Sequence, residues 1–396
     1  DGFVARLSGN LNTLIQSTYL GGSSYDDIQA LAIAANGDVV VGGGTASTDL
    51  PGTSGGAQPS SGGAYDGFVA RLSGNLNTLI QSTYLGGSGT DSIQALAIAA
   101  NGEVVVGGYT YSTNLPGTSG GAQPSSGGGG YDGFVARLSG DLKTLIQSTY
   151  LGGSSSDYIT ALAIAANGDV VVGGHTLSSN LPGTSGGAQP SSGGSLDGFV
   201  ARLSGDLTTL IQSTYLGGSS GDYIYALAIA ASGDVVVGGT TTSTNLPGTS
   251  GGAQPSSGGS YDGFVARLSG DLKAVSPQTI SFPAQSPASH SFVAGGSFPV
   301  NPLASASSGL PVTYTSSTPG VCTVSGSTVT MVAAGTCTIV ASQAGNANWQ
   351  PAPQVSQSVV LAAAAAVVTP VPTLSQWMLL ALSGLLGLLA WRRRAA

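Results

Sequence analysis

The chain alternates short stretches of apolar and β-branched residues with clusters of Gly, Ser, Asn and Pro. Four such stretches occur in the first 65 residues: Phe3 to Leu7, Leu14 to Leu20, Ala30 to Ala34 and Val39 to Gly43. Val, Ile, Tyr and Thr favour strands, and the clusters between them favour turns. The pattern therefore predicts four short strands and few helices in this part of the chain.

The string DGFVARLSG recurs at intervals of 65 or 66 residues. It begins at Asp1, Asp66, Asp132, Asp197 and Asp262. A fixed period of this length is typical of repeat proteins, in which each unit buries its faces only against its neighbours. Four strands per unit fit a β-propeller blade. Residues 1–272 are therefore predicted to form a propeller-type array of four four-stranded units plus the first strand of a fifth.

The third and fourth predicted strands are joined by Asn36-Gly37, a dipeptide that favours a two-residue hairpin turn with positive φ at both positions. With that turn, Gln29 would face Gly44 and Asp27 would face Ala46. In the later units the same register pairs Gln94 with Tyr109, Ser92 with Tyr111, Thr160 with His175, Tyr158 with Leu177, Tyr225 with Thr240 and Tyr223 with Thr242.

These hairpin positions differ between units, whereas most of the repeat hardly changes. Tyr, His and Thr adapt readily to a ligand, and Tyr offers a large rigid surface with a polar tip. We hypothesise a ligand surface, for a glycan or another surface polymer, made by Gln29, Gln94, Tyr109, Tyr111, Tyr158, His175, Tyr223 and Tyr225. The alternative is drift at exposed positions that nothing constrains.

Together, DGFVARLSG, STYLGGS, LAIAANGDVVVGG and the loop LPGTSGGAQPSSGG resemble the SBBP β-propeller repeat family over residues 1–272. Members of that family are mostly extracellular repeat proteins of undefined ligand, so the resemblance implies architecture more than activity. Because the chain opens inside a repeat, we expect it to be part of a longer precursor that carries the export signal and further blades.

Short alternating stretches follow over residues 277–361, which suits an antiparallel sandwich. The stretches SSGLPVTY and GVCTVSGSTVTMVAAGTCTIVASQAGNANW resemble a bacterial Ig-like surface domain. The resemblance implies an Ig-like β-sandwich whose two cysteines, Cys322 and Cys337, form a disulfide in an oxidising compartment.

An Ala-rich linker over 362–370 leads to a tail over 371–396, in which the stretch from Trp377 to Trp391 is uncharged. Apolar length, terminal Trp and flanking Arg predict a transmembrane helix over about 374–391 that holds the chain in the inner membrane with the arginines in the cytoplasm. The tail resembles the IPTL-CTERM sorting signal, with Val371 where Ile is usual. The matching residues are Pro372, Thr373, Leu374, Ser375, Trp377, Arg392, Arg393 and Arg394. The resemblance implies an exosortase-type membrane protease that cuts near this motif and passes the body to the cell surface; a plain C-terminal anchor is the alternative.

Other chemistry finds little support in the residues. A net charge of −8 argues against nucleic acid as a partner. Ser54, Ser119, Ser185 and Ser250 match the Gly-x-Ser-x-Gly pattern, but they lie in Gly- and Pro-rich loops without the strand and helix that a nucleophile elbow needs. No metal site or cofactor is expected. The recurring Asp26, Asp91, Asp157 and Asp222 suit turns better than calcium sites.

The sequence thus predicts an all-β, exported, non-enzymatic protein with a structural, adhesive or ligand-binding role in the bacterial envelope. One alternative is an extracellular propeller enzyme that acts on polysaccharide, with its active site in preceding blades. Such an enzyme would need paired carboxylates or a His-containing cluster, which these units do not supply. Another alternative is a passive matrix protein without a specific ligand.

Overall fold

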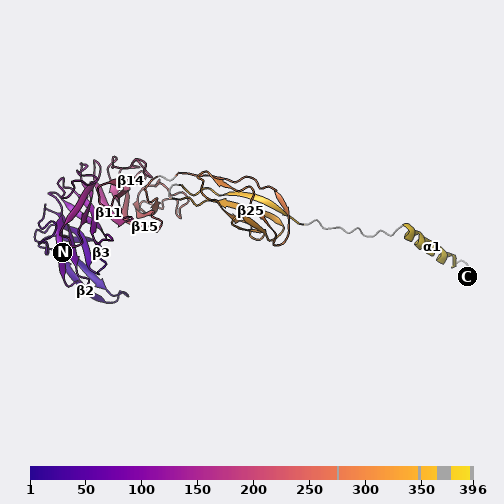
Figure 1. Cartoon of the computed structure of the whole chain (residues 1–396), viewed down its shortest axis with the longest axis horizontal. Helices are drawn as coiled ribbons and strands as arrows, with labels where there is room; N and C mark the ends of the chain where they lie inside the picture. The colour runs from indigo at the N-terminus through magenta and orange to yellow at the C-terminus, as the bar shows by residue number, and fades with distance from the viewer. Residues whose placement is uncertain (274–275, 347–348, 364–375, 393–396) are drawn as a thin grey trace. The chain divides into compact units, whose positions relative to one another are not determined.

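The computed structural model describes residues 1–273, 276–346, 349–363 and 376–392. It divides into two compact units, Asp1–Pro277 with Gly345–Pro351 and Gln278–Ala344 with Ala352–Ala396. The strands of the first unit are β1 (Gly2–Leu7), β2 (Leu14–Leu20), β3 (Asp26–Ile33), β4 (Val39–Thr45), β5 (Asp66–Leu72), β6 (Leu79–Leu85), β7 (Asp91–Ile98), β8 (Val104–Thr110), β9 (Asp132–Leu138), β10 (Leu145–Leu151), β11 (Asp157–Ile164), β12 (Val170–Thr176), β13 (Asp197–Leu203), β14 (Leu210–Leu216), β15 (Asp222–Ile229), β16 (Val235–Thr241) and β17 (Asp262–Leu268). Between them lie only turns and loops (Figure 1).

The first unit contains three four-stranded antiparallel sheets of the same order, β3-β4-β5-β6, β7-β8-β9-β10 and β11-β12-β13-β14. A two-stranded sheet, β1-β2, precedes them, and a three-stranded sheet, β15-β16-β17, follows. Repeated four-stranded antiparallel sheets are confirmed. Their boundaries differ from the sequence repeat, however, because each sheet takes two strands from one repeat and two from the next. The long Pro- and Gly-rich loop therefore runs within a sheet, from its second strand to its third.

The first strand of each sheet, β3, β7, β11 or β15, is called its inner strand. The sheets stack through these inner strands, since β3 contacts β7, β7 contacts β11 and β11 contacts β15. A glycine on the second strand of each sheet makes this approach possible. A Cβ on Gly42 would lie 2.9 Å from Ile93 Cγ2, and a Cβ on Gly107 would lie 2.9 Å from Ile159 Cγ2. Ile93 is fully buried there. The first glycine of VVVGG thus leaves a space beside its Cα, and the isoleucine of the next sheet fills that space.

A β-bulge at the fourth residue of β3, β7, β11 and β15 sets the register of the hairpin. In the first sheet Asp27 pairs with Gly44 and Ala30 pairs with Gly42, so Gln29 is the extra residue. The bulge brings the Asp27 carbonyl to 1.9 Å from the Cβ that a side chain at Gly43 would carry, which explains the second glycine of VVVGG.

The register predicted from the sequence is wrong. Tyr109 pairs with Ser92 rather than Gln94, and His175 pairs with Tyr158 rather than Thr160. The remaining predicted pairs shift in the same way. Thr240, for example, pairs with Tyr223 and not with Tyr225. The hairpin closes through a wider loop than a two-residue turn, with Gly37 N bonded to Ala34 O, and of the Asn-Gly pair only Gly37 has positive φ. The bulge then shifts the pairing between the two strands by one further residue.

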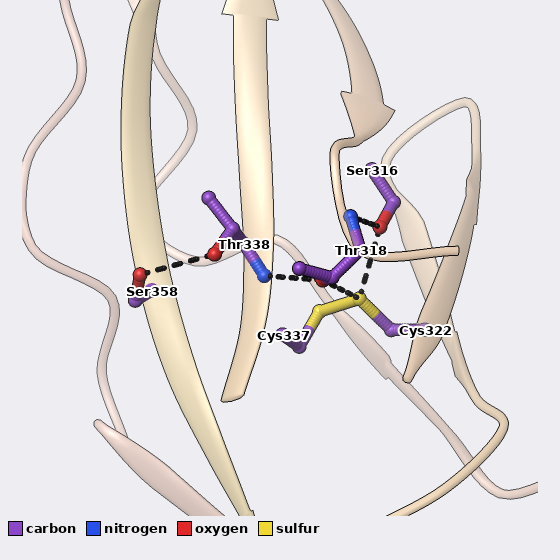
Figure 2. Close-up of a disulfide and its surroundings, with 6 residues drawn as sticks. All are labelled: Ser316, Thr318, Cys322, Cys337, Thr338 and Ser358. Atoms are coloured by element: carbon purple, nitrogen blue, oxygen red, sulfur yellow. Dashed lines mark hydrogen bonds between the residues drawn. A yellow bond between two sulfur atoms is a disulfide. The ribbon is translucent and has the colours of Figure 1, made fainter. Parts of the chain in front are cut away.

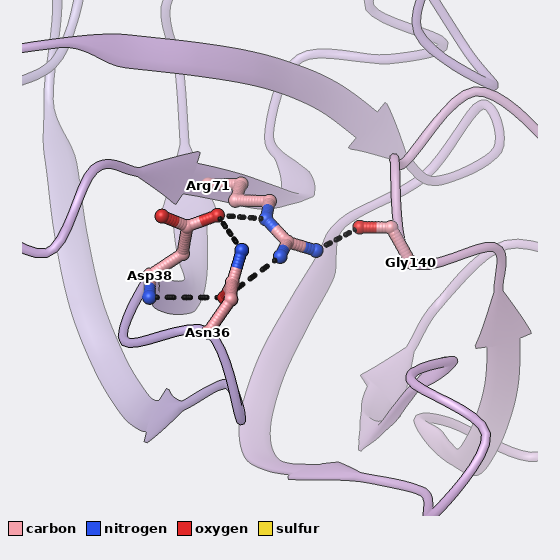
Figure 3. Close-up of polar contacts among 4 residues, drawn as sticks. All are labelled: Asn36, Asp38, Arg71 and Gly140. Atoms are coloured by element: carbon pink, nitrogen blue, oxygen red, sulfur yellow. Dashed lines mark hydrogen bonds and ion pairs between the residues drawn. The ribbon is translucent and has the colours of Figure 1, made fainter.

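Arginine bridges join successive sheets. Figure 3 shows Arg71 of β5, which pairs with Asp38 at 2.9 Å and donates to Asn36 at 3.3 Å, both in the β3–β4 turn of its own sheet. Its Nη1 also donates to the carbonyl of Gly140, which follows β9 in the next sheet. The same link recurs from Arg6 to Gly74, from Arg137 to Gly205 and from Arg202 to Gly270. Each bridge satisfies a carbonyl of the neighbouring sheet.

Buried aspartates begin the inner strands. Asp157 is fully buried and accepts hydrogen bonds from Thr176 Oγ1, from Ser178 Oγ at 2.9 Å and from Gly153 N at 2.7 Å. Burial raises the pKa of Asp157 to about 6, although these hydrogen bonds oppose the shift. Asp26, Asp91 and Asp222 have the same kind of partners. In the described part of the chain no group of three or more His, Cys, Asp or Glu side chains is placed to hold a metal ion.

The second unit contains short strands and one helix. They are β18 (Ile280–Ser281), β19 (Ser289–Ser291), β20 (Ser297–Pro299), β21 (Ser305–Ala306), β22 (Thr313–Ser316), β23 (Cys322–Ser325), β24 (Thr328–Met331), β25 (Gly335–Ser342), β26 (Val355–Ala362) and α1 (Gln376–Arg392). Two main sheets, β19-β26-β25-β22 and β20-β24-β23, share a core of buried residues that includes Val329, Ile339 and Val359.

A disulfide links these two sheets. Figure 2 shows Cys322 of β23 bonded to Cys337 of β25, and both cysteines are fully buried. Thr318 Oγ1 accepts a hydrogen bond of 2.9 Å from Thr338 N beside the bridge. The bond closes a loop of 15 residues, which in the chain-entropy account stabilises the fold by about 3 kcal/mol.

The transmembrane helix predicted over about 374–391 is not supported. Helix α1 has 17 residues, and in the residues that the structure covers no helix is both long enough and apolar enough to cross a bilayer. The leucines of α1, among them Leu382 and Leu386, are exposed.

We predict that replacing Arg71 with Met lowers the free energy of unfolding of the repeat array by about 1–3 kcal/mol, because Asp38 and the Gly140 carbonyl lose a partly buried partner. Arg267 is the matched control, since its side chain is 67% exposed and Arg267→Met should cost about 0.5 kcal/mol or less. Urea unfolding of both variants measures the difference. Equal losses would show that the bridges do not hold the sheets together.

A second prediction concerns pH. Between about pH 4 and pH 6 the folded protein keeps a proton on Asp157 that the unfolded chain has released, so acidification through this window stabilises the fold. Burial lowers the pKa of His175 to about 4, which has the opposite effect, so the carboxyl is isolated by comparison with Asp157→Asn. As the pH falls, wild type should gain unfolding free energy relative to the variant in urea titrations. A constant difference would contradict the raised pKa.

Candidate ligand-binding surface

A continuous row of aromatic rings crosses three sheets at the ends of their inner strands. It starts on β8 and reaches β15, and we call it the aromatic strip. Its members are Tyr109, Tyr111, Tyr131, Tyr158, His175, Tyr223 and Tyr225. Six of the eight sequence-predicted residues belong to it.

Each step of the strip is a ring contact at ordinary packing distance. Tyr109 and Tyr158 come from successive sheets, with ring centroids 5.2 Å apart in an edge-to-face arrangement. Tyr158 stacks on His175 at 4.8 Å, and His175 meets Tyr223 of the next sheet at 5.0 Å. Tyr225 stacks on Tyr223 at 6.0 Å. Such pairs contribute about 0.5–1.5 kcal/mol each beyond area burial, so the rings hold one another in place.

The bulge and the corrected register place these rings. Because Tyr158 faces His175 directly across the β11–β12 ladder, their rings stack on one face of the sheet. Tyr225 occupies the bulge position of its strand, and its side chain is 54% exposed. Tyr111 follows β8 and is 60% exposed. The strip therefore has a half-buried middle and two tyrosines that stand out into solvent.

His175 contributes a neutral ring to the strip. Burial lowers its pKa to about 4, and its Nδ1 is buried without a hydrogen-bond partner among the described residues. An imidazole in this state carries no charge near neutral pH. Its place between Tyr158 and Tyr223 makes it an uncharged ring within the row.

The first sheet is different, and Gln29 and Gln94 do not join the strip. Asp27 accepts hydrogen bonds from Gln29 Nε2 at 2.5 Å and from Tyr65 Oη at 3.0 Å. Burial and the neighbouring Asp27 carboxylate raise the pKa of Tyr65, which stays a neutral donor. Gln94 donates to Ser92 Oγ at 2.9 Å. Both glutamines lie at bulge positions and contact their own strands.

Sequence reasoning missed Tyr131, although it contacts three rings of the strip. It lies just before β9, outside the hairpin that drew attention. A signal was present, because the residue before the DG dipeptide also varies between repeats: it is Tyr65, Tyr131, Leu196 or Tyr261.

Most of the predicted sorting residues cannot be placed. Pro372, Thr373, Leu374, Ser375, Arg393 and Arg394 lie outside the described residues. Trp377 and Arg392 belong to helix α1. In the three complete sheets the loop serines Ser54, Ser119 and Ser185 lie beside the fourth strand, where each serine carbonyl accepts a hydrogen bond from a glutamine Nε2.

Residues 369–396 match the IPTL-CTERM motif. The match confirms the C-terminal sorting signal. It indicates export to the cell surface and processing by exosortase-like machinery.

The chain is 29% identical over 268 residues to the regulatory protein FlaEY of Caulobacter vibrioides. The matched region covers 64% of this chain and 26% of that protein. The chain thus spans about a quarter of that relative's length.

Two solved structures resemble the chain weakly. A protein of unknown function from Dyadobacter fermentans has 15% identity and a TM-score of 0.33, over 59% of this chain and 61% of that chain. A subtype N11 neuraminidase-like protein of a flat-faced bat isolate from Peru has 12% identity and a TM-score of 0.35, over 68% of each chain. Likenesses this weak support no inference about substrate or activity.

Proposed function

We propose that this chain is a non-enzymatic, surface-displayed binding protein that holds a neutral polysaccharide along its aromatic strip. The observation that carries the proposal is the gathering of the variable residues into one row of rings, while the rest of the repeat stays constant. The sorting signal gives the location where a surface polymer would be met.

The chemistry of the strip favours a sugar chain. Aromatic faces pack against the C–H faces of pyranose rings, and tyrosine hydroxyls exchange hydrogen bonds with sugar hydroxyls. The strip repeats its rings from sheet to sheet, which matches a polymer better than a compact ligand. His175 is neutral and the chain is acidic overall, with a net charge of −8, so a polyanion would be repelled.

The remaining parts have supporting roles under this proposal. The second unit, with its buried disulfide, would act as a stalk that carries the array. The stacked sheets keep the rings at fixed spacing, so little conformational entropy is lost when a ligand binds. Catalysis is not part of the proposal, because burial alone lowers the pKa of His175, without a contribution from a carboxylate.

We predict that Tyr111→Ala combined with Tyr225→Ala weakens binding to a neutral cell-surface polysaccharide by roughly tenfold or more, since both exposed rings lose their contact with the ligand. A glycan array followed by titration of the strongest neutral ligand measures the effect. Tyr261→Ala is the matched control, because Tyr261 is 76% exposed and lies outside the strip. If the double variant bound every glycan as wild type does, the strip would not be the binding surface.

A further inference from the structure

Two buried carboxylates meet at the boundary between successive sheets. Asp66 begins β5 of the first complete sheet, and Asp91 begins β7 of the next. Both residues are 0% exposed. Asp66 Oδ1 and Asp91 Oδ2 lie 2.2 Å and 2.7 Å from the position that a Cβ on Gly86 would take, so both oxygens face one point. Each sheet thus contributes one negative group to a buried place between the two.

One oxygen of this pair has no partner. Asp66 Oδ2 accepts hydrogen bonds from Ser61 Oγ at 2.5 Å and from Gly62 N at 2.8 Å. Asp66 Oδ1, in contrast, is buried without a hydrogen-bond partner among the described residues. Both oxygens of Asp91 accept hydrogen bonds. Buried carboxylate oxygens are normally paired with a donor or a cation. Because Asp66 Oδ1 faces a second carboxylate, the partner that it lacks should carry positive charge.

The same arrangement recurs at the next two boundaries, and the oxygen without a partner is again on the aspartate of the third strand. The pairs are Asp132 with Asp157 and Asp197 with Asp222. In the part of the chain that the structure describes, the arginine ion pairs go to the hairpin turns and to none of these aspartates. From the sequence, Asp91 and its counterparts suit turns better than calcium sites. The stacking of the sheets adds the second carboxylate that a cation site needs.

We infer that a calcium ion binds between the two carboxylates at each of these three boundaries. Calcium takes six to eight oxygen ligands at about 2.3–2.6 Å and combines carboxylates with backbone carbonyls and water. Asp66 Oδ1 and Asp91 Oδ2 lie near enough to one point for a single ion to touch both. The hydrogen bonds to their other oxygens hold the two carboxylates in this orientation. Backbone carbonyls of the adjoining Gly86-Gly87 segment and water would complete the ligand set.

An ion in this place would join two sheets, because one carboxylate comes from each. It would also remove the repulsion between two buried negative charges. The chain therefore binds calcium as part of the stacked array, and calcium strengthens the stacking. The pH titration of Asp157 is carried out in EDTA, since a bound cation favours the charged carboxylate.

Thermal unfolding of the wild-type full chain in non-ionic detergent tests the inference. The near-ultraviolet signal of the tyrosines is followed in EDTA and in about 10 mM calcium chloride, well above the dissociation constants of about 0.1–1 mM that are usual for extracellular calcium sites. Calcium should raise the melting temperature by about 5 °C or more. Magnesium at the same concentration should raise it much less, because magnesium keeps most of its waters. No shift with calcium, or an equal shift with magnesium, would overturn the inference.

Replacing one ligand separates calcium binding from a purely structural role. Asp132→Asn should bind one calcium ion fewer per chain in isothermal titration calorimetry, and its melting temperature should rise less with calcium than that of wild type. In EDTA the variant should be at least as stable as wild type, since it loses a buried charge without a partner. A variant that binds as many ions as wild type would contradict the assigned ligand.

Asp262→Asn is the matched control. Asp262 accepts the same loop hydrogen bonds, from Ser257 Oγ at 2.8 Å and Gly258 N at 3.1 Å, but it begins the third strand of the last sheet and no aspartate of a following sheet faces it among the described residues. Its calcium count should equal that of wild type, and a loss of one ion would show that a single loop aspartate suffices. All these measurements are made without a glycan, so their failure leaves the proposed function untouched.

Discussion

The array depends on one repeated contact, in which an isoleucine of one sheet fills the space left by a glycine of the sheet before it. Ile93 meets Gly42 in this way and Ile159 meets Gly107, and each isoleucine is fully buried. A sheet of three or four short strands has two faces to cover and cannot cover them alone. The apolar contact supplies most of the adhesion, since packing of fully buried side chains outweighs a single partly exposed ion pair. The arginine bridges then fix the stagger of neighbouring sheets.

The sequence indicated the strands well and their partners poorly. Leu14–Leu20 forms a strand with the predicted bounds. The third strand begins at Asp26, and the prediction placed its start at Ala30 because the residues before Ala30 are mostly polar and vary between repeats. Neither the bulge nor the shift of the sheets by half a repeat could be seen in the pattern. Both depend on contacts between residues far apart in the chain: the bulge is accommodated by a glycine on the facing strand, and the third strand of each sheet arrives only after a long loop. Periodicity describes local burial and carries no information on such pairing.

For the candidate site, too, the sequence predicted most of the residues but not their arrangement. Comparison of the repeats identified the variable positions, and six of them lie in the aromatic strip. Their mutual arrangement required the stacking of sheets, since Tyr109 reaches Tyr158 only across a sheet boundary. Gln29 and Gln94 were included for their variability alone, yet they lie on bulges and bond to their own strands. Variability therefore marks where the repeat is free to change, and the structure decides which of those positions share a surface.

Under the proposed function, stability and ligand binding would be linked, because the strip forms only where several sheets stack. His175 stacks on Tyr158 of its own sheet, but its other neighbour, Tyr223, comes from the next. A change that loosens the joint between two sheets must therefore separate rings that a ligand would span. Conversely, a polymer bound across several sheets would favour the stacked state over the separated one and would add to its stability by mass action. An array built from nearly identical sheets can thus vary its rings one sheet at a time while the isoleucine and glycine contacts stay fixed.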